Sequence, residues 1–389
     1  MKRPSLIIVL CFICGTVTTS FYAKECQPLI WNMENLKRIK ADSESYNRTI
    51  RKIIEISNQY STSRPISVTD KKRTFAPDKH IYCSIGSYYW PDPVNPGGAY
   101  ITKDGQINPE YYEYDVERLA EMTRRCLYLS LAYFFTENAI YYDSYINQIK
   151  TWFLDEDTYM EPNFDYAGIA PGQNNNKGRC SGIIQTYVFN NLIESVRLMV
   201  SMGEIDTDTY LSLQAWFRSF AYWAENNRYS QTLVRDVKNN IGLAYDVLLV
   251  NIYLFVGNEK RAKEIADRFG KVRINVQINE LGMQPEELKR TKAFSYSIYN
   301  LTHILDFFFL TRYWNDSYFE EQKNRITMAF SFLNQYVDKE HTFPYQQITK
   351  WDKCVNDFKL QFNRLKRLQG NKSFFPQEKN PISIYTLIQ

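Results

Sequence analysis

The stretch "VKNNIGLAYDVLLVNIYLFVG", residues 237–257, contains the pattern that decides the fold class. From residue 242 onward, apolar side chains recur at three- and four-residue spacing, which predicts a core-facing α-helix over 242–257. Just before this helix stand Asn239, Asn240, Ile241 and Gly242, and an Asn-Asn-x-Gly sequence is poor helix chemistry. These residues therefore call for a role other than helix formation.

The same helical pattern extends along most of the chain. Further helices are predicted over residues 115–136, 142–154, 181–200, 208–226, 259–270, 295–314 and 320–337. Strand-like alternation is confined to two short segments, residues 80–85 and 272–278. Because the helices recur in pairs without a solenoid-type repeat, the sequence predicts an all-α fold, an α/α toroid of helical hairpins.

Two long loops interrupt the helical pattern, over residues 84–115 and 160–182. The first contains the consecutive aromatic residues Tyr88, Tyr89 and Trp90, and the second combines Asn, Gly and Pro with Arg179. Long loops inside a helical domain are usually functional. We therefore expect both loops to lie at one rim of the toroid and to build a cleft there.

The N-terminus has the layout of a secretory signal peptide. Lys2 and Arg3 precede an apolar run over about 6–17, which small polar residues follow. The run is too short to span a membrane, and no other stretch is long and apolar enough to do so. The sequence thus predicts a signal peptide over 1–23, a single toroid domain over 24–389, and export across the inner membrane to the periplasm.

Composition narrows the possible functions. Removing the signal lowers the formal net charge from +4 to about +2, which is not typical of a nucleic-acid-binding protein. The three histidines lack metal-binding spacing, so we expect neither a metal nor another cofactor. Five scattered cysteines remain, an odd number that argues against a disulfide framework and leaves one bridge possible. Aromatic residues make up 16% of the chain, and such rings can line a carbohydrate groove.

Several segments point to one family. They are "YYWPDP" followed by "YITKDGQINPE", then "WFLDEDTYMEPNFDYAG", "GRCSGII", "NNIGLAYD", "RINVQI", "GMQPEEL" and "RTKAFSYSIYNL". In this order, over roughly residues 80–310, they resemble the alginate lyase-like superfamily of polysaccharide lyases. The resemblance implies an α/α toroid that cleaves an acidic, uronic-acid-containing polysaccharide by β-elimination.

This reaction places three demands on the site. The C6 carboxylate must be neutralised, a base must remove the C5 proton, and an acid must protonate the leaving C4 oxygen. The resemblance implies that Asn240 and Arg290 neutralise the carboxylate, that Tyr296 is the catalytic tyrosine, and that Asn239 supports the loop. An arginine suits this role because its guanidinium is planar and permanently charged. A nearby cation is also expected to lower the pKa of Tyr296.

Ile241 departs from the family pattern, because the family has a histidine at this position. In β-1,4-linked D-mannuronate or D-glucuronate the C5 proton and C4 oxygen leave from the same face, so one tyrosine can act as base and then as acid. In L-guluronate or L-iduronate they leave from opposite faces, and two groups are needed. Since isoleucine transfers no proton, the sequence favours syn elimination by Tyr296. His303, seven residues after Tyr296, and His80 are the imidazoles that remain to replace the missing one.

Other residues are candidates for binding the polysaccharide. Arg179 precedes a predicted helix start and suits a second uronate carboxylate. Tyr88, Tyr89 and Trp90 are expected to stack on sugar rings, and Tyr166 is a further aromatic candidate. His80 lies beside the same loop and resembles a family position.

Two other functions fit the same sequence. The chain can be a uronan-binding protein that lost turnover together with the histidine. It can also be a glycoside hydrolase on the same fold, which requires two carboxylates across the cleft. The loops and helix starts offer five carboxylates for that purpose: Asp92, Asp104, Glu110, Asp165 and Asp246.

Overall fold

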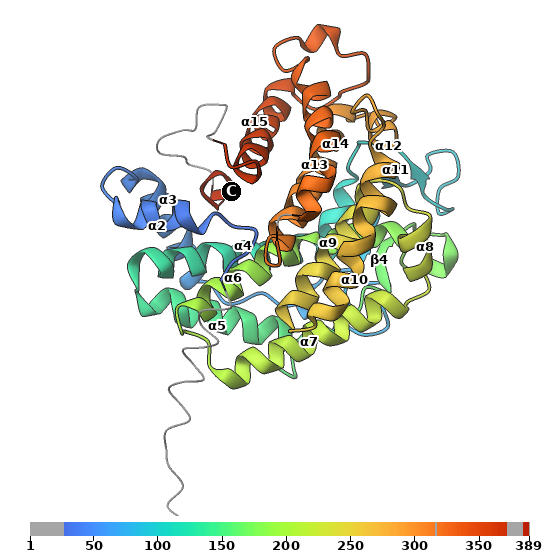
Figure 1. Ribbon diagram of the computed structural model, residues 1–389. Helices are drawn as coiled ribbons and strands as arrows, with labels where there is room; N and C mark the ends of the chain where they lie inside the picture. The colour runs from blue at the N-terminus through green and yellow to red at the C-terminus, as the bar shows by residue number, and fades with distance from the viewer. Residues whose placement is uncertain (1–26, 316, 372–383, 389) are drawn as a thin grey trace, which may run out of the picture.

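A computed structural model describes residues 27–315, 317–371 and 384–388 of the chain. The predicted signal peptide, residues 1–23, lies outside the described residues. Helices make up most of the described chain (Figure 1), as the apolar spacing predicts. The eight helices predicted from that spacing are all present, with ends shifted by a few residues except at 181–200, where the first part is a 3₁₀ helix.

Four helices form an inner series, in which each contacts the next: α4 (Asp115–Thr136), α6 (Phe189–Ser201), α9 (Asn240–Phe255) and α13 (Ala293–Thr311). Apolar side chains surround α9 and α13 on nearly every side, as expected for helices at the centre of a protein. The outer helices pack against this series: α5 (Ala139–Phe153), α7 (Thr207–Asn226), α10 (Glu259–Phe269), α14 (Ser317–Asn334) and α15 (Trp351–Leu368). This double ring confirms the predicted α/α toroid.

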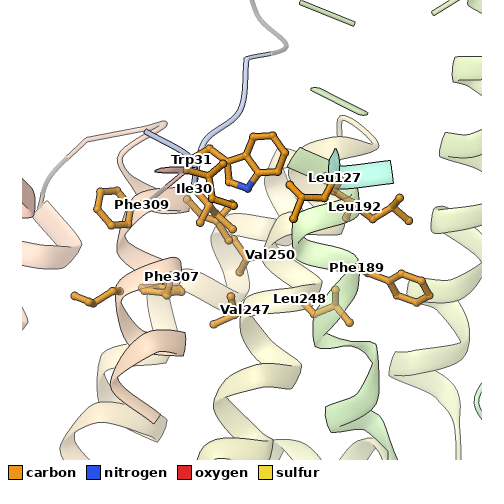
Figure 2. Close-up of a cluster of buried hydrophobic side chains, with 14 of the residues drawn as sticks. Ile30, Trp31, Leu127, Phe189, Leu192, Val247, Leu248, Val250, Phe307 and Phe309 are labelled. Carbon is orange, nitrogen blue, oxygen red and sulfur yellow. The ribbon is translucent and has the colours of Figure 1, made fainter. Parts of the chain in front are cut away.

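The two ends of the described chain meet on one side of the toroid. Helix α2 (Met33–Ala41), which precedes α3 (Asn47–Ser61), contacts the last helix, α16 (Ile384–Ile388). Just before α2, Ile30 and Trp31 lie over the later turns of α9 and α13, close to Val250 and Phe309 (Figure 2). The first turns of the same two helices carry Asn240 and Tyr296, so this N-terminal segment covers the end opposite to those residues.

The two predicted loops carry short strands and 3₁₀ helices. Strand β1 (Cys83–Ile85) pairs in parallel with β4 (Tyr166–Ile169), and β2 (Tyr89–Trp90) pairs antiparallel with β3 (Ile101–Thr102). The β1–β4 pairing joins the two loops at one rim. The remaining short helices are η1 (Val68–Asp70), η2 (Pro109–Glu113), η3 (Asn174–Asn176), η4 (Cys180–Val188), α8 (Ser230–Arg235), α12 (Pro285–Leu288) and η6 (Glu340–Thr342).

The strand predicted over residues 272–278 is wrong. This segment continues α10 as a π-helical turn, η5 (Gly270–Ile274), followed by α11 (Asn275–Gln277). The alternation of apolar and polar residues is typical of a strand with one face in solvent. Arg273 and Gln277 are instead buried together with Ile274 and Ile278, and their spacing of three and four residues is helical.

Candidate active site

The first turn of α9 is built around a buried arginine. Asn239 caps the helix, with its side-chain oxygen accepting a hydrogen bond from the Ile241 amide at 3.1 Å, a role for which asparagine is well suited. Arg273 donates to the carbonyl oxygen of Val237 at 2.7 Å and to the carboxylate of Asp246 at 2.7 Å. A Cβ atom at Gly242 would lie 2.5 Å from Arg273 Nη1, so only glycine leaves room for the guanidinium. The unusual Asn-Asn-Ile-Gly sequence is thus explained by a cap and by this close approach.

Asn240 forms a two-point contact with Glu287 of α12. Its backbone N–H and its side-chain Nδ2 donate to the two carboxylate oxygens of Glu287, each at 2.8 Å. Asn240 is only 3% exposed and Glu287 only 1%. Burial raises the pKa of Glu287 to about 7, although the hydrogen bonds from Asn240 oppose this shift. The contact fixes the orientation of the Asn240 carboxamide and uses one of its two amide hydrogens.

Tyr296, Arg290 and Tyr88 come together at the rim. The Tyr296 hydroxyl lies 2.5 Å from the Tyr88 hydroxyl and accepts a hydrogen bond from Arg290 Nη2 at 3.1 Å. The Arg290 guanidinium also lies over the Tyr296 ring, 4.0 Å from its centroid. Tyr88 comes from the first long loop, Arg290 from the segment before α13 and Tyr296 from the first turn of α13, so the loop and the helix start together build this cluster.

Asp104 holds Arg290 in this position. Its carboxylate accepts from Arg290 Nη2 at 2.6 Å and Nε at 3.3 Å, and from the backbone and hydroxyl of Thr291, each at 3.1 Å. Although partial burial acts to raise it, these hydrogen bonds lower the pKa of Asp104 to about 2. The guanidinium is therefore anchored by a permanent carboxylate, and the nitrogen that contacts this carboxylate, Nη2, also donates to the Tyr296 hydroxyl.

The expected lowering of the Tyr296 pKa is wrong in its net direction. Burial and the hydrogen bond with Tyr88 raise the pKa of Tyr296 well above its usual value, and the charge of Arg290 offsets only part of this rise. Tyr296 is consequently a neutral phenol in the free protein at neutral pH.

Arg179 lies beside a second group of predicted residues. Its Nη1 donates to the Tyr89 hydroxyl at 2.7 Å, and its guanidinium lies 4.2 Å from the centre of the Tyr89 ring. Together with Lys238, Asn239 and Ile241 it lines a pocket of about 550 Å³, here called the Arg179 pocket. Asp236 and Glu286 line the same pocket, so Ile241 faces a concave surface that carries both positive and negative side chains as well as an amide group.

The remaining candidates, Trp90, Tyr166 and His80, have hydrogen-bond partners outside the Tyr296 cluster. The Trp90 indole donates to the Gln106 carbonyl, and the Tyr166 hydroxyl accepts from Lys177. The His80 imidazole pairs with the Tyr159 carbonyl at 2.7 Å and packs on the Tyr159 ring.

His303 is fully buried between two tyrosine rings, and burial lowers its pKa to about 3. Its imidazole therefore lies in the core rather than on the rim surface that carries the Tyr296 cluster.

The sequence analysis did not select Glu287, and it named Asp104 only as a candidate hydrolase carboxylate, not as the partner of Arg290. Glu287 lies in "PEEL", and a proline followed by two glutamates is typical of an ordinary helix start, which conceals its burial. Asp104 precedes Gly105, whose φ of 75° marks a tight turn, and Asp-Gly is a common turn sequence. In both cases a helix start or a turn already explains the local sequence. Only the tertiary structure therefore reveals that Glu287 contacts Asn240 and that Asp104 contacts Arg290.

The carboxylates needed by a hydrolase have other partners. Asp104 is paired with Arg290, and Asp246 is fully buried between Arg268 and Arg273. Asp165 accepts from the Trp223 indole at 2.9 Å, and Glu110 accepts from the Tyr100 hydroxyl at 2.8 Å. These contacts make none of the four a free acid or base facing a second carboxylate across a cleft.

Comparison with known proteins decides the family. The model of the alginate lyase family matches residues 67–343, which is more than half of the chain. A crystal structure of an alginate lyase from Bacteroides ovatus is 32% identical, with a TM-score of 0.85, and the match covers 92% of this chain and 98% of that one. The chain belongs to the alginate lyase family. It is accordingly a polysaccharide lyase that acts on a uronic-acid polymer.

More distant comparisons add little. Alginate lyase A1-III from Sphingomonas species A1 is 12% identical, with a TM-score of 0.49 over 84% of this chain and 88% of that one. A search of curated proteins gave no significant match to this alginate lyase family member.

Among the described residues of the lyase, no group of three or more His, Cys, Asp or Glu side chains is arranged to hold a metal ion. The cysteines of the described ranges, Cys83, Cys126, Cys180 and Cys354, are free thiols. Within the same ranges, no helix has the length and apolarity to cross a membrane.

Proposed function

We propose that this lyase cleaves β-1,4-linked D-mannuronate or D-glucuronate by syn β-elimination, with Tyr296 acting as base and then as acid. The observation that supports this most is the position of the Tyr296 hydroxyl between the Tyr88 hydroxyl and Arg290 Nη2. When Tyr296 loses its proton, both neighbours can donate hydrogen bonds to the phenolate oxygen. This arrangement stabilises the charged base where it forms.

In the proposed reaction the Tyr296 phenolate takes the C5 proton, and the electron pair of that bond forms the C4–C5 double bond. The C4–O bond breaks, and Tyr296 returns the proton to the leaving O4. Because the pKa of Tyr296 is raised in the free protein, the active phenolate is a minor form at neutral pH. We therefore expect kcat/KM to rise as the pH is increased above neutrality.

The substrate carboxylate must be neutralised at the same time. Arg290 brings positive charge to the Tyr296 hydroxyl, and Asn239 and Asn240 place amide groups at the N-terminus of α9, where the helix dipole favours an anion. Ile241 adds no proton donor to this group. For that reason we assign the lyase to syn substrates, which need one proton-transferring residue.

The test is to incubate the purified protein with polymannuronate, glucuronan and polyguluronate and to follow the ultraviolet absorbance of the unsaturated product. We expect turnover of one or both D-uronate polymers, little or none of polyguluronate, and loss of turnover in Tyr296→Phe. Turnover of polyguluronate at the same rate would contradict the assignment to syn substrates.

A catalytically inactive uronan-binding protein is the second candidate, and Ile241 is the observation that favours it. The variant Ile241→His separates the two candidates. If the wild type is inactive and this variant is active, the isoleucine disabled the enzyme. If the wild type is active on D-uronates and the variant gains polyguluronate turnover, Ile241 restricts the substrate.

We also propose that the lyase is exported to the periplasm, on the strength of the basic, apolar and small-polar segments at its N-terminus. Mass spectrometry of the protein from fractionated cells provides the test. We expect a mature N-terminus near residue 24 in the periplasmic fraction. A full-length cytoplasmic protein would contradict export.

A further inference from the structure

A second pocket lies close to Arg179 along the chain. It has a volume of about 490 Å³, and its lining includes the cations Lys177 and Arg228, the carboxylate of Asp165, and the aromatic residues Tyr222 and Trp223. We call it the Lys177 pocket. Lys177 lines this pocket, and Arg179, two residues further along the chain, lines the Arg179 pocket.

The basic residues Lys177, Arg179 and Arg228 share an unusual arrangement. Arg179 is held by the Gly168 carbonyl and the Tyr89 hydroxyl, and Arg228 donates to the Gly178 carbonyl at 2.9 Å. Lys177 contacts the Tyr166 hydroxyl and lies 4.1 Å from the centre of its ring. Among the described residues, none of these three cations forms an ion pair with a carboxylate, so their positive charge is oriented but not neutralised.

The Lys177 pocket also offers the surfaces that sugars require. Tyr222 on α7 is 71% exposed, which is high for so large an aromatic side chain. Trp223 beside it is held in place by its hydrogen bond to Asp165. An exposed ring provides an apolar face for the C–H groups of a pyranose, and the neighbouring cations suit its carboxylate.

A continuous series of contacts connects this pocket with the reacting residues. Tyr296 contacts Tyr88, the neighbouring Tyr89 contacts Arg179, and Arg228 bonds the carbonyl of Gly178, next to Arg179. Arg228 lies in the short link between α7 and α8, two helices that contact each other (Figure 1). The series of contacts thus leads from Tyr296 by way of Arg179, which lines the first pocket, to Arg228, which lines the second.

We propose that the Lys177 pocket is a remote binding subsite for a uronate residue of the same polysaccharide chain, with Lys177 and Arg228 binding its carboxylate and Tyr222 stacking on its ring. The inference rests on the proposed function for the identity of the ligand. It adds that the lyase holds a long stretch of polymer rather than only the sugars next to the cleaved bond.

Binding measurements test the subsite independently of catalysis. Isothermal titration calorimetry compares trimers with longer saturated D-uronate oligosaccharides, on the Tyr296→Phe protein and on the same protein carrying Lys177→Gln and Arg228→Gln. Two lost surface charge contacts should weaken binding of the long oligosaccharides about tenfold and leave trimer binding unchanged. Tyr222→Ala, an exposed change that does not endanger folding, should act in the same direction.

The matched control is Lys260→Gln with Lys263→Gln, which removes the same charge from exposed positions on α10. Equal affinity of the long oligosaccharides for the control, the Lys177 and Arg228 double variant, and Tyr222→Ala would overturn the proposal. An equal loss for trimers and long oligosaccharides would also overturn it, because the residues would then not form a remote subsite. If the protein binds length-dependently but no uronan is cleaved, the proposed function fails and the subsite stands.

Discussion

The contact between Glu287 and Asn240 predicts a specific dependence of stability on pH. Glu287 is 1% exposed, and burial raises its pKa from 4.5 to about 7. Between these values the unfolded chain releases the proton while the folded protein keeps it. The stabilisation is therefore complete below about pH 4.5 and is lost as the pH rises to about 7 and above. The size of the loss is about 3 kcal/mol, since each tenfold change in an equilibrium constant corresponds to about 1.4 kcal/mol.

The variant Glu287→Gln removes this titration and keeps the shape of the side chain. Urea unfolding between pH 4.5 and 8.5 measures the difference. At pH 4.5 the two proteins should differ by no more than about 1 kcal/mol, the value of one altered hydrogen bond. As the pH rises to 8, the free energy of unfolding of the wild type should fall by about 3 kcal/mol more than that of the variant.

The neighbouring Glu286 provides the control, because it is exposed and pairs with Lys289 at the surface. Glu286→Gln should follow the wild type across the whole pH range. Other buried acids, such as Asp115 with a pKa raised by burial to about 6, are present in all three proteins and cancel in the comparison. Parallel curves for the wild type and Glu287→Gln would refute the reasoning.

Three further changes test the rim cluster and the α9 start. Asp104→Asn should lower kcat about tenfold, because Arg290 would lose one charge-assisted contact, and the circular dichroism spectrum should stay unchanged. An unaltered kcat would show that Arg290 needs no anchor. Tyr88→Phe should also lower kcat about tenfold and change KM little, and a change confined to KM would assign Tyr88 to substrate binding alone. Gly242→Ala should destabilise the protein by about 1–3 kcal/mol in urea unfolding, because its Cβ would lie 2.4 Å from the Val237 carbonyl oxygen and 2.5 Å from Arg273 Nη1. Wild-type stability would mean that this backbone and the arginine move aside freely.

Helices were predictable wherever a side chain's polarity matched its environment. The segment 115–136 and α4 coincide because most of its apolar residues face the core, while its charged residues, apart from the buried Asp115, are at least partly exposed. The segment 272–278 failed because Arg273 is polar and yet buried, with its charge compensated by Asp246 and carbonyl oxygens. A pattern of polarity cannot reveal such compensation, since the partners lie 27 to 40 residues away along the chain.

In the candidate site, too, some residues were predictable from the sequence and others were not. Family resemblance selected Tyr296 and Arg290, and the run of aromatic residues in the first loop selected Tyr88 as a residue for stacking on sugars. The structure brings these three side chains into contact. The resemblance did not select Glu287 or Asp104, because both act on other side chains across the fold. The effect of burial on the Tyr296 pKa could not be predicted from the sequence either, because desolvation depends on the whole surroundings of the hydroxyl rather than on its nearest charge.

The buried Arg273, which contacts the backbone just before α9, affects how freely residue 241 can be substituted in this enzyme. Arg273, the Asn239 cap and the Asn240–Glu287 contact hold the backbone on both sides of residue 241 without using its side chain. Position 241 is thus a replaceable element on a rigid support, and its side chain faces the Arg179 pocket. The Ile241 side chain also packs against the hydrophobic core. An exchange to histidine there therefore changes which protons the site can transfer, and the cost to the fold is confined to the packing of this one side chain.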